Sequence, residues 1–304
     1  MSRYRILSLD GGGIRGVLTV VLLERLEQLH PTFLQQIDLF AGTSTGGLLA
    51  LGLAAGKTPA AIRRLYETQG RQVFADSLFD DVRDLGHLIG AQYSLAPLKD
   101  ALTELFGDLT LADLPRRVLI SAFDLDNRPA DPRQYRSWKA KFFHNFPGAE
   151  SDGAARVVDV ALYTAAAPTY FPTYQGFIDG GVVAGNPSVC ALAQALHPGT
   201  GGQKLEDIAL LSLGTGHNPK HLELEDADWG LAQWAAHLVT LMLEGSTGLA
   251  DYQCRQFLAD AYFRLNPRLP YEIDMDCVDE VPLMAELARQ CDLDDVLDWL
   301  ERCF

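Results

Sequence analysis

Hydrophobic and polar positions along the chain alternate between short apolar runs of strand length and longer segments of helical length. The apolar run Tyr4–Leu9 precedes a glycine cluster and then residues 17–29, whose apolar positions recur over a helix-length segment. A second unit follows, with a strand over residues 37–41, the turn GTSTGG and an apolar helix that ends at Gly56. The sequence therefore predicts two successive strand–turn–helix units.

The alternation continues through the middle of the chain. Thr58 is placed to cap a third helix, because Pro59 follows it at the first helical position. Residues 70–92 are less regular and are expected to form a mobile cover. Further strands are predicted over residues 117–123, 177–179 and 208–213, and further helices over residues 95–106, 157–167, 229–244 and 281–302.

Strands that alternate with helices predict an α/β fold, a three-layer sandwich with a mostly parallel central sheet flanked by helices. No internal repeat or low-complexity linker interrupts the chain, so one domain is expected. Within it, residues 1–215 form the α/β part, and residues 216–304 form a helical C-terminal extension packed on the same domain.

Charge narrows the classes of partner. The formal net charge of −15 opposes binding to DNA, RNA or strongly anionic membranes, so no nucleic-acid partner is expected. Residues 271–304 hold eleven Asp or Glu against two Arg, a pattern typical of a solvated face, with a partner-docking surface as the alternative. The oligomeric state is left open.

Cysteine usage and the absence of long apolar segments indicate the compartment. The five cysteines form no CxxC pair and have no neighbouring histidine at metal-binding spacing, so we expect a reducing compartment, no metal and no cofactor. The first residues lack the pattern of a signal peptide, and no segment reaches the roughly 18 apolar residues of a membrane span. A cytoplasmic protein, peripheral at membranes at most, is expected.

The turn Gly42-Thr43-Ser44-Thr45-Gly46 matches GxSxG, in which small residues let the chain turn sharply between a strand and a helix. Such a turn projects the serine oxygen to a helix N-terminus, which stabilises developing negative charge. An ordinary glycine-rich turn with an N-cap serine is the alternative. The apolar strand before the turn favours a nucleophilic Ser44.

The earlier cluster Asp10-Gly11-Gly12-Gly13-Ile14-Arg15-Gly16 can supply backbone N–H groups to a substrate oxygen, as an oxyanion hole does. Arg15 either orients this loop or is a surface residue. Gly11, Gly13 and Gly16 also fit GxGxxG, so a dinucleotide site is the rival interpretation. Against it, Asp10 places negative charge beside a pyrophosphate, and no acid ends the second strand.

A third element is Asp179-Gly180-Gly181, which follows a short apolar strand. An aspartate there can accept the Ser44 proton if the two oxygens come within hydrogen-bond reach, although Asp-Gly is also a common turn. Together, DGGGIRG, GTSTG and DGG, in this order, resemble the patatin-like phospholipase family. The segment AAPTYFP at 166–172 is similar too, and the resemblance spans residues 6–186, with LLSLGTG at 210–216 as a weaker continuation.

The resemblance implies that residues 1–215 are catalytic and use a Ser–Asp dyad. Ser44 would attack an ester carbonyl, Asp179 would accept its proton, and Gly11, Gly12 and Gly13 would stabilise the oxyanion. Water would then release a free fatty acid from Ser44. Relatives often have two asparagines before the proline of Gly185-Asn186-Pro187, a small departure that leaves the dyad untouched.

Two alternatives stay open beside the dyad. A Ser-His-Asp triad is permitted by chain order, with His197, His217, His221 and His237 as candidates. A non-catalytic nucleotide- or lipid-binding module could retain the same fold. For an enzyme, the resemblance implies an acyl lipid substrate, phospholipid first, and transient contact with a membrane surface. Apolar pairs that could line an acyl groove are Leu78-Phe79, Phe142-Phe143 and Tyr170-Phe171, with a core position as the alternative.

Overall fold

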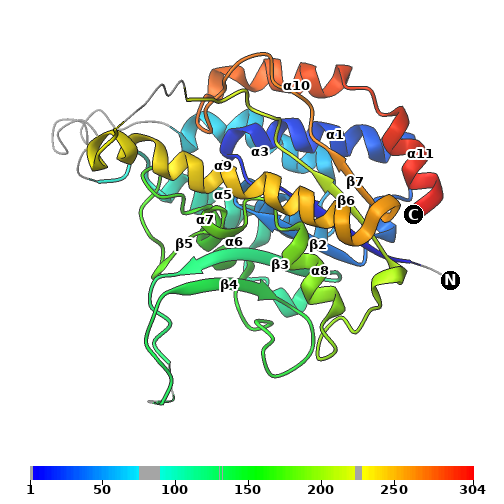
Figure 1. Ribbon diagram of the computed structural model, residues 1–304, viewed down its shortest axis with the longest axis horizontal. Coiled ribbons are helices and arrows are strands. Elements are labelled where there is room, and N and C mark those ends of the chain that lie inside the picture. Colours follow the sequence, from blue (N-terminus) through cyan, green and yellow to red (C-terminus); the bar gives the residue numbers. More distant parts are fainter. Residues whose placement is uncertain (1–2, 75–89, 130, 132, 223–227) are drawn as a thin grey trace.

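A mixed, mostly parallel sheet forms the centre of the molecule (Figure 1). The computed structural model describes residues 3–74, 90–129, 131, 133–222 and 228–304. The strand order is β4-β3-β2-β1-β6-β7; β4 and β5 run antiparallel to β3, whereas the other pairs are parallel. The strands are β1 (Tyr4–Leu9), β2 (Leu39–Thr43), β3 (Arg117–Asp124), β4 (Lys139–His144), β5 (Phe177–Asp179), β6 (Ile208–Leu213) and β7 (Tyr262–Leu265).

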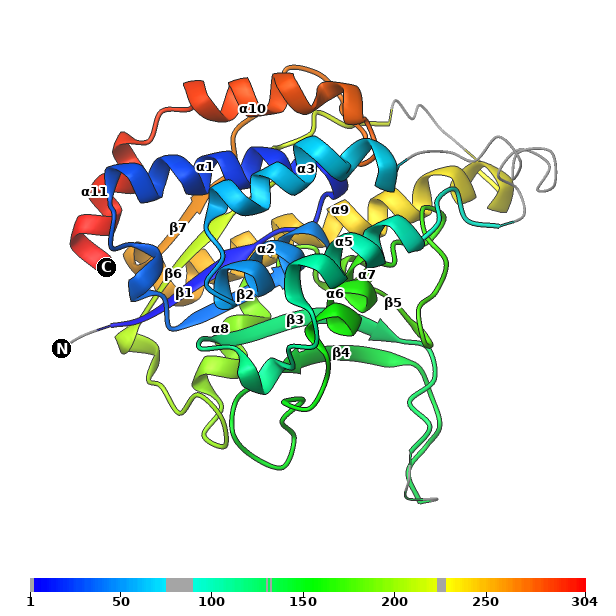
Figure 2. The same cartoon turned by 180° about the vertical axis from the view of Figure 1, so that it is seen from behind.

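Helices cover both faces of this sheet. Helices α8 and α9 lie over the face seen in Figure 1, and α1, α2, α3 and α5 over the face seen in Figure 2. The helices are α1 (Gly16–Leu29), α2 (Thr45–Ala54), α3 (Pro59–Val73), α5 (Ala96–Phe106), α6 (Val157–Ala165), α7 (Gly181–Ala184), α8 (Ser188–Leu196), α9 (Leu231–Leu258), α10 (Val281–Gln290) and α11 (Asp294–Cys303).

Strand β1 shows how the sequence builds two cores. Successive strand side chains point to opposite faces, so Leu7 and Leu9 enter the core beneath α1 and α2, while Ile6 enters the core beneath α8 and α9. All three side chains are fully buried. The predicted three-layer α/β fold is therefore confirmed.

The elements near the N-terminus follow the sequence pattern closely. The Thr58 side chain accepts a hydrogen bond from the Ala61 N–H at 3.2 Å, and Pro59 is the first residue of α3, as predicted. Helix α2 begins at Thr45, directly after Ser44, and the strands β3, β5 and β6 lie within one residue of their predicted bounds. Within the predicted mobile cover, residues 75–89 lie outside the described residues.

The C-terminal third is mainly helical, as predicted, but it also contributes a strand to the sheet. Strand β7, which the sequence analysis missed, pairs in parallel with β6 and so extends the central sheet. Its four residues include Arg264, and so short a run is weak evidence for a strand. The single helix predicted over residues 281–302 is in fact α10 and α11, because the Asp292 carboxylate accepts the Asp294 N–H and starts a new helix.

Candidate active site

Ser44 occupies a strained turn between β2 and α2. Its φ of 53° and ψ of −125° lie in a backbone region that costs a non-glycine residue about 1–3 kcal/mol. Glycines allow the turn to form: a Cβ on Gly46 would lie 2.2 Å from the Leu9 carbonyl oxygen. The Ser44 N–H donates to Thr164 Oγ1 at 2.8 Å, which holds the turn against α6. The Ser44 hydroxyl is thus presented at the N-terminus of α2.

Asp179 ends β5 and is almost completely buried, with 1% of its surface exposed. Burial raises the pKa of the Asp179 carboxyl to about 7, because removal from water disfavours the charged form. Two neighbours lower this pKa in turn, because they favour the charged carboxylate: the Ser44 hydroxyl, and the Gly181 N–H, which donates to Asp179 Oδ1 at 2.7 Å. The fold therefore brings the side chains of Ser44 and Asp179 together.

The glycine loop after β1 lies against the serine turn, since a Cβ on Gly11 would meet Ser44 Cβ at 3.3 Å. The Gly11 N–H donates to the Gly185 carbonyl at 2.9 Å and is therefore occupied. Within the described part of the chain, the N–H groups of Gly12 and Gly13 have no acceptor. Of the three predicted oxyanion donors, Gly12 and Gly13 are the ones left free to bind a substrate oxygen.

Arg15 is buried and orients this loop; the interpretation as a surface arginine is wrong. Its guanidinium donates to the Ile273 carbonyl and forms an ion pair with Glu244 of α9 at 2.7 Å. Asp10, at the start of the loop, forms a buried ion pair with Arg264 of β7. Both ends of the glycine loop are thus anchored by charges from the C-terminal third.

Four residues of this site were not predicted from the sequence: Thr164, Thr215, Glu244 and Arg264. Thr215 donates to the Gly11 carbonyl at 2.9 Å and lies in LLSLGTG, the segment noted as a weaker continuation of the resemblance. That segment was the signal available for Thr215. The other three residues stand in no motif, and their distance along the chain hides their contacts.

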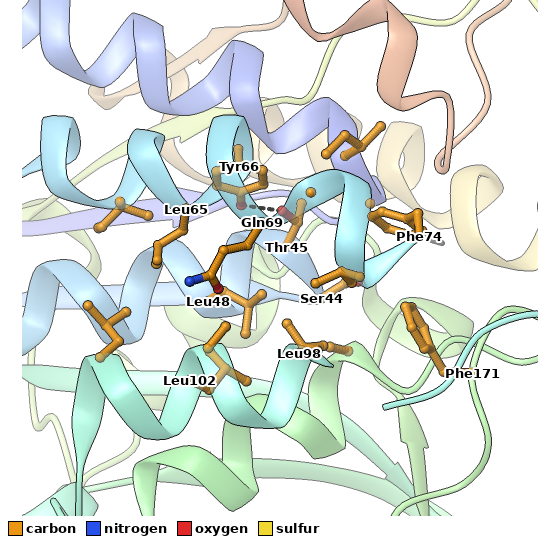
Figure 3. A pocket seen from close by; sticks show the side chains of 18 residues that line it. Ser44, Thr45, Leu48, Leu65, Tyr66, Gln69, Phe74, Leu98, Leu102 and Phe171 are labelled. Atoms are coloured by element: carbon orange, nitrogen blue, oxygen red, sulfur yellow. Dashed lines mark hydrogen bonds between the residues drawn. The ribbon is translucent and has the colours of Figure 1, made fainter. Parts of the chain in front are cut away.

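Two cavities of different chemistry meet at Ser44. The smaller, about 100 Å³, is apolar and lies between α2, α3 and α5 (Figure 3). Its lining includes Ser44, Leu48, Tyr66, Phe74, Leu98, Leu102 and Phe171. The larger, about 1020 Å³, has a mixed lining with many charged and polar side chains, and we call it the polar cavity; its lining includes Ser44, Asp179, Gly12, Arg15, Tyr170, His217, Lys220 and Glu244.

The three apolar pairs that could line an acyl groove lie in different parts of the structure. Phe171 lines the apolar cavity, and its neighbour Tyr170 lines the polar one. Phe143 stacks on Tyr163 with ring centroids 5.2 Å apart, and Phe142 packs on the core beneath α8, so this pair is structural. Leu78-Phe79 lies outside the described residues.

Among the described residues, three of the four candidate histidines, His197, His217 and His237, show no contact that would make them members of a triad. His217, His221 and His237 line the polar cavity, but neither His217 nor His237 hydrogen-bonds to Ser44 or Asp179. The His237 ring stacks on Trp229. His197 accepts the Gly199 N–H at 3.1 Å in a separate loop and lines neither cavity.

Among the described residues, no helix is long and apolar enough to cross a bilayer. In the same part of the chain, no three His, Cys, Asp or Glu side chains come together as metal ligands.

Comparison with known proteins identifies the family. The model of the patatin-like phospholipase family matches residues 7–189. The chain is 30% identical to a putative sporulation hydrolase, CotR, of Bacillus subtilis, over 99% of this chain and 98% of that protein. It is 34% identical to a cGAMP-activated phospholipase of Pseudomonas aeruginosa, over 87% and 78% of the two chains. With Patatin-like protein 2 of Arabidopsis thaliana the identity is 28%, over 81% of this chain and 70% of that protein.

Because the matched segment runs from β1 through Asp179, and a relative aligns along nearly its whole length, the chain belongs to the patatin-like phospholipase family of carboxylic ester hydrolases.

Proposed function

We propose that this protein is a phospholipid acyl hydrolase that works through a Ser44–Asp179 dyad. The observation that carries the proposal is the interaction of the Ser44 hydroxyl with the buried Asp179 carboxylate at the junction of an apolar and a polar cavity. An ester bond held at this junction would place its fatty-acyl chain in the apolar cavity and its headgroup in the polar one.

The reaction would proceed in two stages. Asp179 would take the proton of Ser44 as the oxygen attacks the ester carbonyl, and the N–H groups of Gly12 and Gly13 would donate to the developing oxyanion. The protonated Asp179 would return that proton to the leaving alcohol, which leaves an acyl group on Ser44. Water, deprotonated by the same carboxylate, would then release the fatty acid.

The decisive experiment measures fatty-acid release from phosphatidylcholine vesicles. Ser44→Ala and Asp179→Asn should each reduce the rate by about 10³-fold or more, because each removes one half of the proton transfer. His217→Ala should keep most of the activity, and His197→Ala, outside both cavities, serves as its control. A loss with His217→Ala as large as that with Asp179→Asn would favour the triad instead.

A fluorophosphonate probe separates an enzyme from a non-catalytic module with the same fold. The probe reacts only with an activated serine, so labelling of the wild type and not of Ser44→Ala is expected. Folded wild-type protein that forms no adduct would indicate a binding module. Parallel assays with short nitrophenyl esters distinguish a phospholipase from a generic esterase.

A further inference from the structure

Helix α9 carries an apolar stripe on the side opposite to its buried side. It packs inward through Leu243, Ala250, Cys254 and Leu258, which are buried, as the spacing of one helix face requires. Leu238, Leu241, Met242, Leu249 and Tyr252 lie on the other side and are 42% to 63% exposed. We call these five residues the α9 outer face. A helix that is apolar on both sides is normally covered on both sides.

The charged residues on and near the α9 outer face indicate which kind of surface it can contact. From residue 238 to 250 Glu244 is the sole charged residue, and its carboxylate turns inward to pair with Arg15. An outer face without charge complements an uncharged surface. The net charge of −15 for the whole chain opposes contact with an anionic one.

The position of the α9 outer face, beside the cavity that contains Ser44, also favours one kind of partner. Leu241 belongs both to this face and to the lining of the polar cavity that contains Ser44. Figure 1 shows α9 running across the near side of the molecule, over the sheet and beside α7. A second protein seated on this face would obstruct the cavity, whereas a bilayer would bring acyl esters to it.

We propose that the α9 outer face docks on a neutral, zwitterionic lipid surface and holds the polar cavity against it. This inference rests on the proposed function, since lipid esters must be the substrate for such docking to serve catalysis. Aromatic side chains that favour a membrane–water interface lie at both ends of α9. Trp229 and Trp234 are in edge contact at its start, and Tyr252 is exposed towards its end.

The test uses co-sedimentation with phosphatidylcholine vesicles. All proteins in this measurement carry Ser44→Ala, so binding is read without hydrolysis. Adding Leu238→Gln, Met242→Gln and Leu249→Gln, none of which lines either cavity, should weaken vesicle binding at least about tenfold. Leu29→Gln, exposed at the C-terminal end of α1, should leave binding unchanged.

The same triple change in active protein separates docking from catalysis. Hydrolysis of vesicle lipid should fall about as much as binding, while hydrolysis of a soluble short-chain ester stays unchanged, which also shows that the site is folded. Equal vesicle binding by the triple and control variants would overturn the proposal. So would a dimer in sedimentation equilibrium that the triple change dissociates, because a second copy would then cover this face. If wild-type protein hydrolysed no ester yet bound vesicles through α9, the proposed function would fail and docking would stand.

Discussion

At the scale of single residues, Asp179 combines two opposed environments. Burial pushes its carboxyl towards the neutral form, whereas the Ser44 hydroxyl and the Gly181 N–H favour the charged form. The balance, a pKa of about 7, suits the proposed role of Asp179, which is to accept and return a proton near neutral pH.

This pKa predicts the acid limb of the pH profile. Protonated Asp179 cannot accept the Ser44 proton, so kcat/KM should rise about tenfold per pH unit below pH 7 and level off above it. The check is a pH–rate profile with a soluble ester from pH 5 to 9. A rate that stays constant across that range would contradict a titrating Asp179 base.

The same shift predicts a stability effect with a definite sign. The folded carboxyl holds its proton up to about pH 7, but the unfolded one only up to about pH 4. The native state therefore binds more protons between these values, and its stability falls as pH rises. Asp179→Asn, which is uncharged, should increase the free energy of unfolding by about 1–4 kcal/mol at pH 8 and bring no such gain at pH 4. Urea unfolding at both pH values tests this.

Strain at Ser44 gives a second stability prediction. Ser44→Ala and Ser44→Gly both lack the hydroxyl and should both be inactive, but glycine alone adopts φ 53°, ψ −125° without a Cβ clash. The glycine variant should be more stable than the alanine variant by about 1 kcal/mol. Denaturant midpoints would show the order, and an alanine variant that is equally stable would argue against strain.

At the scale of elements, three helices together form the wall of the apolar cavity. Leu48 comes from α2, Tyr66 from α3, and Leu98 and Leu102 from successive turns of α5 (Figure 3). Tyr66 also hydrogen-bonds Thr45, the residue after Ser44, so the wall of the cavity is tied to the serine turn. Acyl-chain selection should therefore depend on side chains remote from Ser44 in sequence.

Narrowing this cavity should change the preferred chain length. In Figure 3, Leu102 lies farther from Ser44 than Leu98 does, so Leu102→Phe should shorten the space for an acyl chain. Hydrolysis of a sixteen-carbon ester should fall about tenfold, the effect of roughly 1.4 kcal/mol, while a four-carbon ester is unaffected. Equal loss for both esters would indicate general damage to packing, which the thermal midpoint would reveal independently.

At the scale of the whole molecule, residues 216–304 complete both the sheet and the site. Strand β7 pairs with β6, Arg264 neutralises Asp10, and the Met275 carbonyl accepts the Ile14 N–H at 2.7 Å. The expected boundary at residue 215 thus passes between parts that share hydrogen bonds and a buried charge pair.

Removing these contacts should prevent folding. A chain of residues 1–215 should lack a cooperative unfolding transition, because it leaves one edge of β6 without its β7 partner and Asp10 buried without its cation. As a finer test, Arg264→Met should destabilise the full chain by about 3–5 kcal/mol, and adding Asp10→Asn should recover much of this. A stable, cooperative fragment 1–215 would show that the C-terminal part is dispensable for the fold.

Local patterns in the sequence determined the class of the fold and the identity of the main groups. The apolar runs before residues 10, 44 and 179 marked strands that end at one edge of the sheet, and glycines marked the turns there. These features could be predicted because periodicity and turn chemistry act over a few neighbouring residues. Strand β7 and the break between α10 and α11 could not, since their local signals are short and pairing with β6 decides the strand.

Only the tertiary structure decided how the groups act together. It placed Ser44 beside Asp179, used the Gly11 N–H for Gly185, and paired Arg15 and Asp10 with Glu244 and Arg264. It also formed the two cavities and left one side of α9 exposed. Such properties depend on burial and on contacts between residues more than 100 positions apart, and burial is what raises the pKa of Asp179 to about 7.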